Sequence, residues 1–181
     1  MDETKEVKQK HLFTCDQKLE WWGYGEWVEE PDLVEFEYKC YCCNVKRIAV
    51  KEPYAKVHHV FGGHLCGYVK IPLELMIHKK GFDLNIDCHG GITFNDLDEK
   101  GENWIGFDCV HLNDICPSME KLNNTLPELI EIRKKHQELM DKLNLERSSF
   151  FDKTYKNINL CIEECKSIVD QIIEGKWKDD N

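Results

Sequence analysis

Leu33-Val34-Glu35-Phe36-Glu37-Tyr38 is the stretch that decides the fold class. Its apolar side chains alternate with two glutamates, which is the period of a strand with one buried face. Similar short runs follow at 43–50, 57–61, 65–71, 82–88, 92–94 and 104–110, with glycine- and proline-rich turns between them. Spacings of roughly 8–12 residues predict an antiparallel sheet or a small barrel over about 21–112, rather than βαβ units.

The residues before this region are less regular. Residues 1–20 are polar and predict an N-terminal arm or a short helix. Trp21, Trp22 and Trp27 are interleaved with Gly23 and Gly25, which favours a turn-rich aromatic corner over a regular element.

After Pro117 the apolar period becomes helical. Leu129, Ile132, Leu139 and Leu143 recur at helical spacing and predict a helix over 125–143, with Thr125 as its cap. A second helix is predicted over 152–174, with a stripe of apolar residues at Tyr155, Ile158, Cys161, Ile162, Cys165, Ile168, Val169 and Ile172. The short connection predicts antiparallel neighbours packed on the sheet. The result is an α+β fold: an arm at 1–20, a β-rich domain at 21–117 with the candidate site, and a helical pair at 118–181.

Composition narrows the function classes. The 181 residues hold 24 Lys and Arg against 34 Asp and Glu, a formal charge of −10. No apolar run approaches the roughly 20 residues of a membrane span, and Asp2, Glu3 and Lys5 lie where a signal peptide needs an apolar core. We therefore expect a cytoplasmic protein with no membrane partner. In that compartment the ten cysteines are thiols, metal ligands or core residues rather than disulfides.

An acidic stretch gives the first candidate surface. Residues 20–37 contain seven acidic side chains and no Lys or Arg, which excludes independent non-specific DNA binding and favours a basic protein partner. The alternative is a solvated strand face. The residues predicted to bind such a partner are Glu26, Glu29, Glu30, Asp32, Glu35 and Glu37.

Chemically active residue types gather at the ends of two predicted strands. His89 follows one strand and precedes Gly90-Gly91, whose amides would form an anion site. Asp108 and His111 follow another strand and reach the same site only if the chain turns after Cys109 or Val110. Two imidazoles and a carboxylate would provide general acid–base catalysis. Alternatively Cys109 is the nucleophile, or the whole set is structural. Further predicted substrate contacts are Tyr68, Thr93, Trp104 and Asp114.

Cys40-Tyr41-Cys42-Cys43 contains a Cys-x-x-Cys spacing, but no second such pair accompanies it and its cysteines are too tightly spaced for a zinc knuckle, so no metal or other cofactor is expected. The alternative is a zinc site built on Cys109-x-His111 or His64-x-Cys66, which place two ligand types on one strand face. Cys161 and Cys165 lie on the apolar helical stripe and are predicted to be core residues.

Several strings resemble a known group of proteins. They are Glu30-Pro31-Asp32, Cys66-Gly67-Tyr68-Val69, His89-Gly90-Gly91-Ile92-Thr93 and Trp104-Ile105-Gly106-Phe107-Asp108-Cys109-Val110-His111. They are similar to motifs of a widespread group of phage, prophage and mobile-element accessory proteins, over about 21–117 and again over 157–172. The chain departs from the pattern at His78-Lys79, at Asn103 and at Asn113-Asp114. The motifs name no reaction. The resemblance implies a mobile-element setting and, by analogy, an anti-defence role that includes anti-CRISPR proteins.

Three functions remain open at this point. The leading hypothesis is an anti-defence protein whose His/Asp/Cys pocket binds and cleaves a phosphodiester in RNA or a nucleotide. Because the chain is acidic, a basic partner such as a guide-RNA nuclease complex would have to present the RNA. The second hypothesis is a non-catalytic acidic inhibitor that occupies the basic nucleic-acid channel of a defence nuclease. The third is a module that sequesters a nucleotide messenger, with Trp22 or Trp104 stacked on its base.

Overall fold

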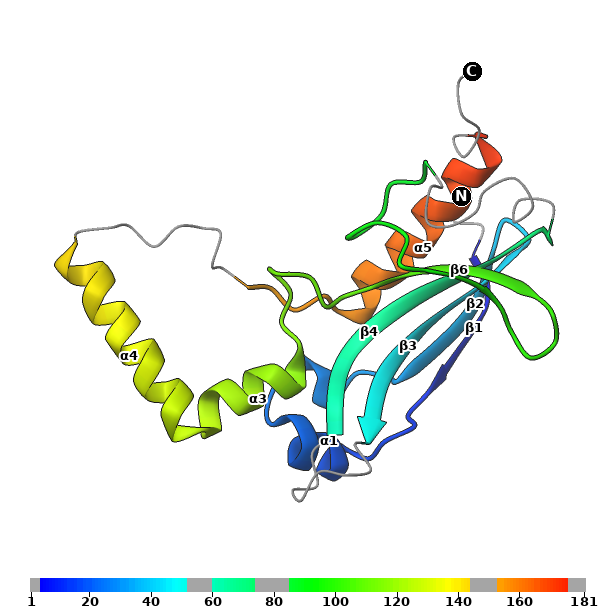
Figure 1. The fold of residues 1–181 in the computed structure, drawn as a ribbon. Helices are drawn as coiled ribbons and strands as arrows, with labels where there is room; N and C mark the ends of the chain where they lie inside the picture. Colours follow the sequence, from blue (N-terminus) through cyan, green and yellow to red (C-terminus); the bar gives the residue numbers. More distant parts are fainter. Residues whose placement is uncertain (1–3, 52–59, 74–84, 144–152, 176–181) are drawn as a thin grey trace.

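The framework of the protein, in a computed structural model that describes residues 4–51, 60–73, 85–143 and 153–175, is one antiparallel sheet with the strand order β1-β2-β3-β4-β6-β5 (Figure 1). The strands are β1 (Thr4–Lys10), β2 (Leu33–Tyr38), β3 (Tyr41–Lys51), β4 (Val60–Ile71), β5 (Phe94–Leu97) and β6 (Asn103–Asp108). β1 and β5 are the two edges, so the described strands form an open sheet rather than a closed barrel. The predicted α+β class is confirmed.

The N-terminal residues form the short helix that was one of the two predictions, and also a strand that was not predicted. Residues of the expected arm form β1, which pairs with β2, and helix α1 (Cys15–Trp22), which Thr14 and Gln17 start with a reciprocal capping box. Trp22 therefore lies in the last turn of a helix rather than in an irregular corner, and its indole N–H donates to the Val60 carbonyl (3.0 Å). A short 3-10 turn, η1 (Glu26–Val28), follows.

The predicted runs 57–61 and 65–71 belong to a single strand in their described part. β4 passes through Gly62 and Gly63, where we predicted a turn, with φ angles of 110° and 85°. A β-carbon on Gly62 would lie 2.3 Å from the Ile48 carbonyl oxygen, opposite a shift in the β3–β4 register between Arg47 and Ala49. The two glycines therefore form a bulge. Residues 57–59 lie outside the described part of the chain.

The described part of the run predicted at 82–88 forms no strand. The side chain of Gln171 takes the place of a neighbouring strand: its Oε1 accepts the Asp87 N–H (2.7 Å), and its Nε2 donates to the Asp87 carbonyl (2.6 Å). The expected alternation persists in the burial, because Ile86 is buried between exposed Asn85 and Asp87.

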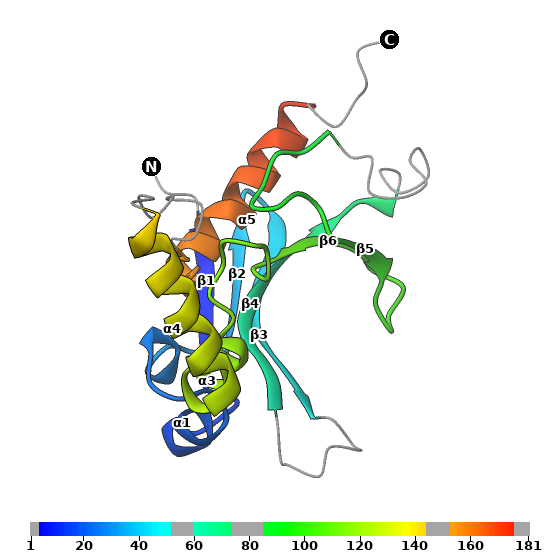
Figure 2. The same cartoon turned by 60° about the vertical axis from the view of Figure 1, so that its left-hand side comes forward.

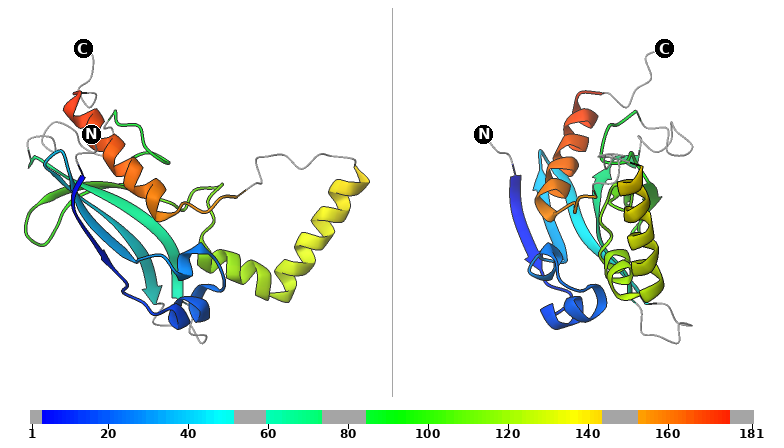
Figure 3. Two further views of the ribbon diagram at one scale, coloured as in Figure 1. Left: turned by 180° about the vertical axis from the view of Figure 1, so that it is seen from behind. Right: turned by 90° about the vertical axis from the view of Figure 1, so that its left-hand side faces the viewer.

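Three helices follow the sheet, and their arrangement differs from the predicted pair. The expected helix 125–143 is divided into α3 (Pro117–Thr125) and α4 (Pro127–Lys142), with Leu126 at the junction. Thr125 ends α3 instead of capping the next helix. α4 has no buried residue and extends away from the sheet as an arm, not beside α5 (Ile158–Ile173), as the left view of Figure 3 shows. In the view of Figure 2 α4 lies in front of the sheet. None of the helices in the described ranges is long and apolar enough to cross a membrane.

Helix α5 supplies the core that the sequence predicted. Asn157 caps it, and its apolar stripe packs on one face of the sheet. Cys161, Cys165, Ile168 and Val169 are completely buried, together with Val45, Leu65, Val69 and Ile105 from the strands. Burial of each large side chain contributes about 1.5–3 kcal/mol. Cys161 and Cys165 are core residues, as predicted.

A buried charge network centred on Arg47 joins α1, β2 and β3. Arg47 Nε donates to Asp32 Oδ1 (2.9 Å), and Lys18 Nζ lies 2.8 Å from the same oxygen. The side chains of Lys18, Asp32 and Arg47 have no exposed surface. The other Asp32 oxygen accepts backbone N–H groups of Leu12 and Phe13. Every charge in this network is therefore paired inside the protein.

The same network fixes the start of α5. Arg47 Nη2 donates to Glu30 Oε2 (2.9 Å), while Glu30 Oε1 accepts the backbone N–H of Ile158 (3.1 Å) at the first helical residue. The Tyr155 hydroxyl accepts from Arg47 Nη1 (2.8 Å) and donates to Glu30 Oε2 (2.6 Å). Burial raises the pKa of Tyr155, so its phenol keeps the proton that it donates.

The predicted acidic partner surface is consequently divided. Asp32 is buried and Glu30 is held in the network, so neither is presented to a partner. Glu26 and Glu29 are exposed near η1. Glu35 pairs with Lys10 (2.7 Å) and lines a separate hollow with Glu37. The charged stretch in the sequence is not one continuous acidic patch.

We predict that Arg47→Met destabilises the protein by about 3–5 kcal/mol, because it leaves buried carboxylates without their counter-charge. Lys46→Met is the matched control: Lys46 is the exposed neighbour on the same strand and should change stability by less than about 0.5 kcal/mol. Urea unfolding followed by circular dichroism measures both. Equal effects of the two substitutions would show that the network does not stabilise the fold.

Candidate functional site

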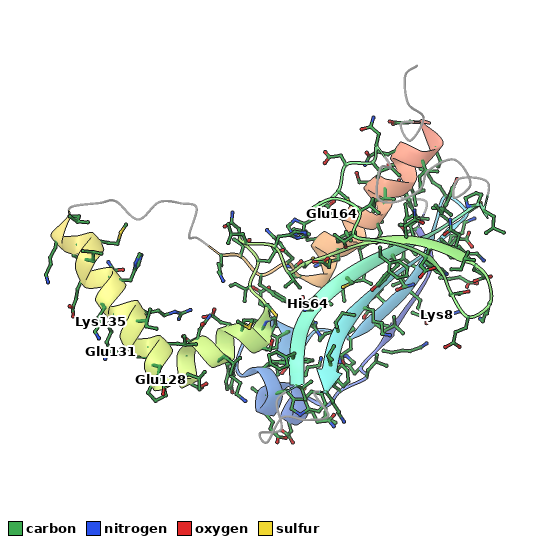
Figure 4. All side chains as sticks on the ribbon, in the orientation of Figure 1. Lys8, His64, Glu128, Glu131, Lys135 and Glu164 are labelled. Carbon is green, nitrogen blue, oxygen red and sulfur yellow. The ribbon has the colours of Figure 1, made fainter. Side chains whose placement is uncertain are left out.

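Two loops meet beside α5 to form the candidate site, one after residue 85 and one after β6. The first loop contains His89, whose backbone N–H donates to Glu164 Oε2 (3.0 Å) on α5. Glu164 and Gln171 thus hold this loop from two successive parts of the helix. Figure 4 labels Glu164 on α5 and His64 on β4, which flank the region of the loops.

The second loop makes the turn that the sequence argument required. β6 ends at Asp108, and the Asp114 N–H then donates to the His111 carbonyl (2.9 Å). Thr154, just before α5, donates to the Asn113 carbonyl and accepts the Ile115 N–H, each at 3.0 Å. Both loops of the site are therefore attached to α5 or to the segment that leads into it.

The two loops bring His89, His111 and Asp114 together. Asp114 Oδ2 lies 2.8 Å from His89 Nε2 and 3.2 Å from His111 Nδ1, and it also accepts the His111 backbone N–H (2.9 Å). The two imidazole rings are 5.1 Å apart and nearly perpendicular. Two imidazoles thus share one carboxylate oxygen. We predicted from the sequence that all three residues belong to the site, but we predicted only a substrate contact for Asp114.

Asp114 is the buried anchor of the cluster, with 1% of its side chain exposed against 20% for His89 and 34% for His111. Burial raises the pKa of the Asp114 carboxyl, but the hydrogen bonds with His89 and His111 outweigh burial and lower it. Asp114 therefore remains an anion at neutral pH. Lys156 Nζ lies 3.9 Å from its second oxygen, Oδ1.

Asp108, predicted as the orienting carboxylate, occupies an outer position. Its Oδ1 lies 4.0 Å from His111 Nε2, on the side of the ring opposite Asp114, and accepts the Val110 N–H (3.1 Å). Asp114 makes the direct contacts with both rings that we expected of Asp108.

The paired glycines shape the site rather than provide two free amides. The Gly91 N–H donates to the Cys88 carbonyl (2.9 Å) and is not available to an anion. Gly90 has a φ of 69°, and a β-carbon there would lie 1.9 Å from His111 Cε1. A glycine at this position lets the His111 ring lie directly against the backbone.

Cys109 does not lie among the imidazoles. It is buried in the core with its sulfur 3.6 Å from that of Cys161. The contact with Cys161, reinforced by burial, raises the pKa of the Cys109 thiol, which disfavours the nucleophilic thiolate. The structure gives the Cys109 nucleophile no support.

The other predicted substrate contacts lie elsewhere. Tyr68 packs over Gly106 and edge-on against Phe94, with ring centroids 5.3 Å apart. The Thr93 N–H bonds the Gly106 carbonyl (2.8 Å). Trp104 lines a hollow of about 230 Å³ together with Glu35 and Glu37, and none of the clustered residues lines that hollow.

A second hollow, of about 220 Å³, opens beside the cluster. His111, Asp114, Cys116 and Lys153 contribute to its lining. Cys116 lies at the N-cap of α3, with its sulfur 3.9 Å from His64 Nδ1. Sequence reasoning assigned no role to Lys153, Lys156 or Glu164, because nothing in their local pattern distinguishes them from surface residues.

The clustered groups are suited to two kinds of chemistry. Imidazoles oriented by a carboxylate can transfer protons near neutral pH. The same nitrogen and oxygen atoms of His89, His111 and Asp114 could hold a metal ion. Comparisons with protein-family models, with curated proteins and with solved structures found no match, so function has to be inferred from this geometry.

We predict that Gly90→Ala displaces the His111 ring, whereas Gly91→Ala does not. Both positions have left-handed φ angles, so each substitution costs about 1–2 kcal/mol of backbone strain. Only at Gly90 would the new methyl group collide with the imidazole, since nothing lies within 4 Å of the corresponding position at Gly91. Imidazole resonances in NMR spectra and urea unfolding measure the two effects. An unmoved His111 resonance in Gly90→Ala would contradict the described packing.

Proposed function

We propose that the hollow beside His89, His111 and Asp114 binds and hydrolyses a phosphodiester in RNA or in a nucleotide, and that the protein is a cytoplasmic anti-defence protein of the anti-CRISPR kind. The observation that supports this proposal is the pair of imidazoles on one buried carboxylate, of which His111 and Asp114 line an open hollow. Removing a carboxylate from water is costly. A buried carboxylate beside partly exposed histidines is therefore more common at functional sites than in places where side chains only pack.

The reaction is a displacement at phosphorus by water. The water oxygen forms a bond to phosphorus, the bond from phosphorus to the leaving oxygen breaks, and the proton released by the water reaches the leaving oxygen. The products are a phosphate monoester and an alcohol, and no electrons are transferred. In this proposal the cluster activates the water, and Asp114 holds both rings in place.

The local charge near the hollow is more favourable to a phosphate than the net charge of the whole chain. Lys153 lines the hollow and Lys156 Nζ lies 3.9 Å from Asp114 Oδ1, so two ammonium groups belong to this region. The protein as a whole carries a charge of −10 and repels free RNA. We therefore propose that a basic partner, such as a guide-RNA nuclease complex, presents the RNA.

The two alternative functions have less support. The inhibitor that fills a basic channel needs a continuous acidic face, but Asp32 is buried and Glu30 is held by Arg47. The messenger-binding module needs an accessible indole near the site. Trp22 is buried, and Trp104 belongs to the other hollow.

We predict that His89→Ala, His111→Ala and Asp114→Asn each reduce phosphodiester cleavage by about 10²–10⁴-fold, the usual contribution of a group that transfers or activates a proton. The substrates are bis(p-nitrophenyl) phosphate and a 5′-labelled RNA, tested free and as the guide of an effector complex. His11→Ala, at an exposed histidine outside the site, is the control and should retain full activity.

If a basic partner presents the RNA, RNA held by the effector complex should be cleaved faster than free RNA. Intact RNA under all conditions, or full activity in both histidine variants of the cluster, would exclude the proposed hydrolysis. A stable stoichiometric complex with intact RNA would instead favour the non-catalytic inhibitor.

A further inference from the structure

The ligand atoms of His89, His111 and Asp114 lie close enough together to hold a metal ion. One nitrogen from each histidine and one carboxylate oxygen all lie within 4.8 Å of one another. The distances from Asp114 Oδ2 to His89 Nε2 and His111 Nδ1 are 2.8 and 3.2 Å. Bonds of about 2.0–2.1 Å to a tetrahedral zinc ion place neighbouring ligand atoms roughly 3.3 Å apart. Small side-chain shifts would therefore admit the ion.

We propose that His89, His111 and Asp114 bind one divalent ion of the zinc type, with a fourth position open toward the 220 Å³ hollow. This inference rests on the proposed hydrolytic function in that it names the cofactor of the same site. Imidazole ligands favour zinc and related transition metals over magnesium or calcium, which prefer oxygen ligands only. Three protein ligands with one open position are typical of catalytic rather than structural zinc.

The second oxygen of Asp114 provides an independent observation. Only 1% of the Asp114 side chain is exposed, so water has little access to Oδ1, and this oxygen accepts no hydrogen bond from the described residues. Its nearest charged neighbour among them is Lys156, at 3.9 Å, which is too far for a direct hydrogen bond. Buried carboxylate oxygens normally have a partner. A cation between the three side chains would provide one, because a carboxylate can bind a metal through either or both of its oxygens.

The surroundings of the cluster resemble the outer shell of a metal site. If His111 binds the ion through Nδ1, its Nε2 carries the proton and faces Asp108 Oδ1, 4.0 Å away. At this distance the carboxylate acts on the ring through its negative charge rather than through a direct hydrogen bond, and a carboxylate behind a ligand histidine increases the basicity of the ring. The backbone N–H of His111 fixes Asp114, and Glu164 fixes the backbone of His89. Metal binding thus gives Asp108 a positioning role that direct proton transfer does not.

A bound zinc ion would explain how the site activates water at neutral pH. The ion lowers the pKa of a bound water to about 7 and polarises a phosphoryl oxygen. The hollow next to the open position has room for the substrate, and Lys153 in its lining would attract the phosphate.

The test measures metal binding separately from hydrolysis. Untagged protein is stripped with a chelator, dialysed against zinc chloride and analysed by elemental mass spectrometry and by calorimetric titration. We expect one zinc per chain, at least a hundredfold weaker binding in His89→Ala and His111→Ala, and about 10–100-fold weaker binding in Asp108→Asn. Asp114→Asn preserves the shape of the side chain if Asp114→Ala fails to fold, and circular dichroism checks folding in each variant.

Because the chain has ten cysteines, the ligand type must also be measured. Cobalt(II) substitution distinguishes nitrogen and oxygen ligands from thiolates, since thiolates give an intense charge-transfer band. We expect no such band, and we expect His64→Ala, which alters the Cys116 pair, to bind zinc normally. A thiolate band, or no stoichiometric zinc, would overturn the inference.

The outcomes separate the two proposals. Cleavage by protein that binds no stoichiometric zinc would refute the metal site and leave the hydrolytic function standing. One zinc bound by His89, His111 and Asp114 without any cleavage would leave the metal site standing and refute the function.

Discussion

The rest of the structure depends on the pairing of Arg47 with Asp32 and Glu30 inside the protein. A buried guanidinium is tolerated only when its donors are paired, and here they bond the carboxylates of segment 30–32, the Gly63 carbonyl and the Tyr155 hydroxyl. Such a network specifies one arrangement, because any other packing would leave a charge unpaired. The pairing also determines where α5 begins, since Glu30 accepts the first helical N–H, that of Ile158.

The candidate site is a consequence of that placement. From its fixed start, α5 presents Glu164 and Gln171 to the loop of His89, and the preceding Thr154 pairs with the loop of Asp114. Strand pairing covers neither loop completely. The contacts with α5 and with Thr154 therefore determine the distance between the imidazoles. Glu30 bonds Tyr155 and Ile158, while Thr154 bonds the loop that carries Asp114, so the segment that leads into α5 connects the Glu-Pro-Asp string at 30–32 with the site.

The sequence predicted the features that follow from local periodicity. Alternation identified β2, a short strand-like run identified β6, and the apolar stripe at Ile158, Cys161 and Cys165 identified α5 and its buried face. Gly62 and Gly63 predicted a turn, but they form a bulge within β4. Leu126 and Pro127 divide a helical pattern that looked continuous, and α4 leaves exposed the apolar residues that we expected to be packed.

The site was predictable in part. The turn after β6 brought His89 and His111 to one place, but local pattern could not show that Asp114 rather than Asp108 lies between them. Buried charges were the largest error: Lys18 and Asp32 have the sequence environment of surface residues, and only long-range pairing explains their burial. Cys109 stood in a chemically suggestive string, yet alternation along β6 turns it toward α5 and Cys161.

The most direct measurement is an anomalous difference map from crystals of the protein grown with zinc chloride. The account predicts one strong peak about 2.0–2.2 Å from His89 Nε2, His111 Nδ1 and the Asp114 carboxylate, with the fourth position facing the hollow. A peak on cysteine sulfurs alone, or imidazole rings that point away from Asp114 with no ion between them, would contradict it.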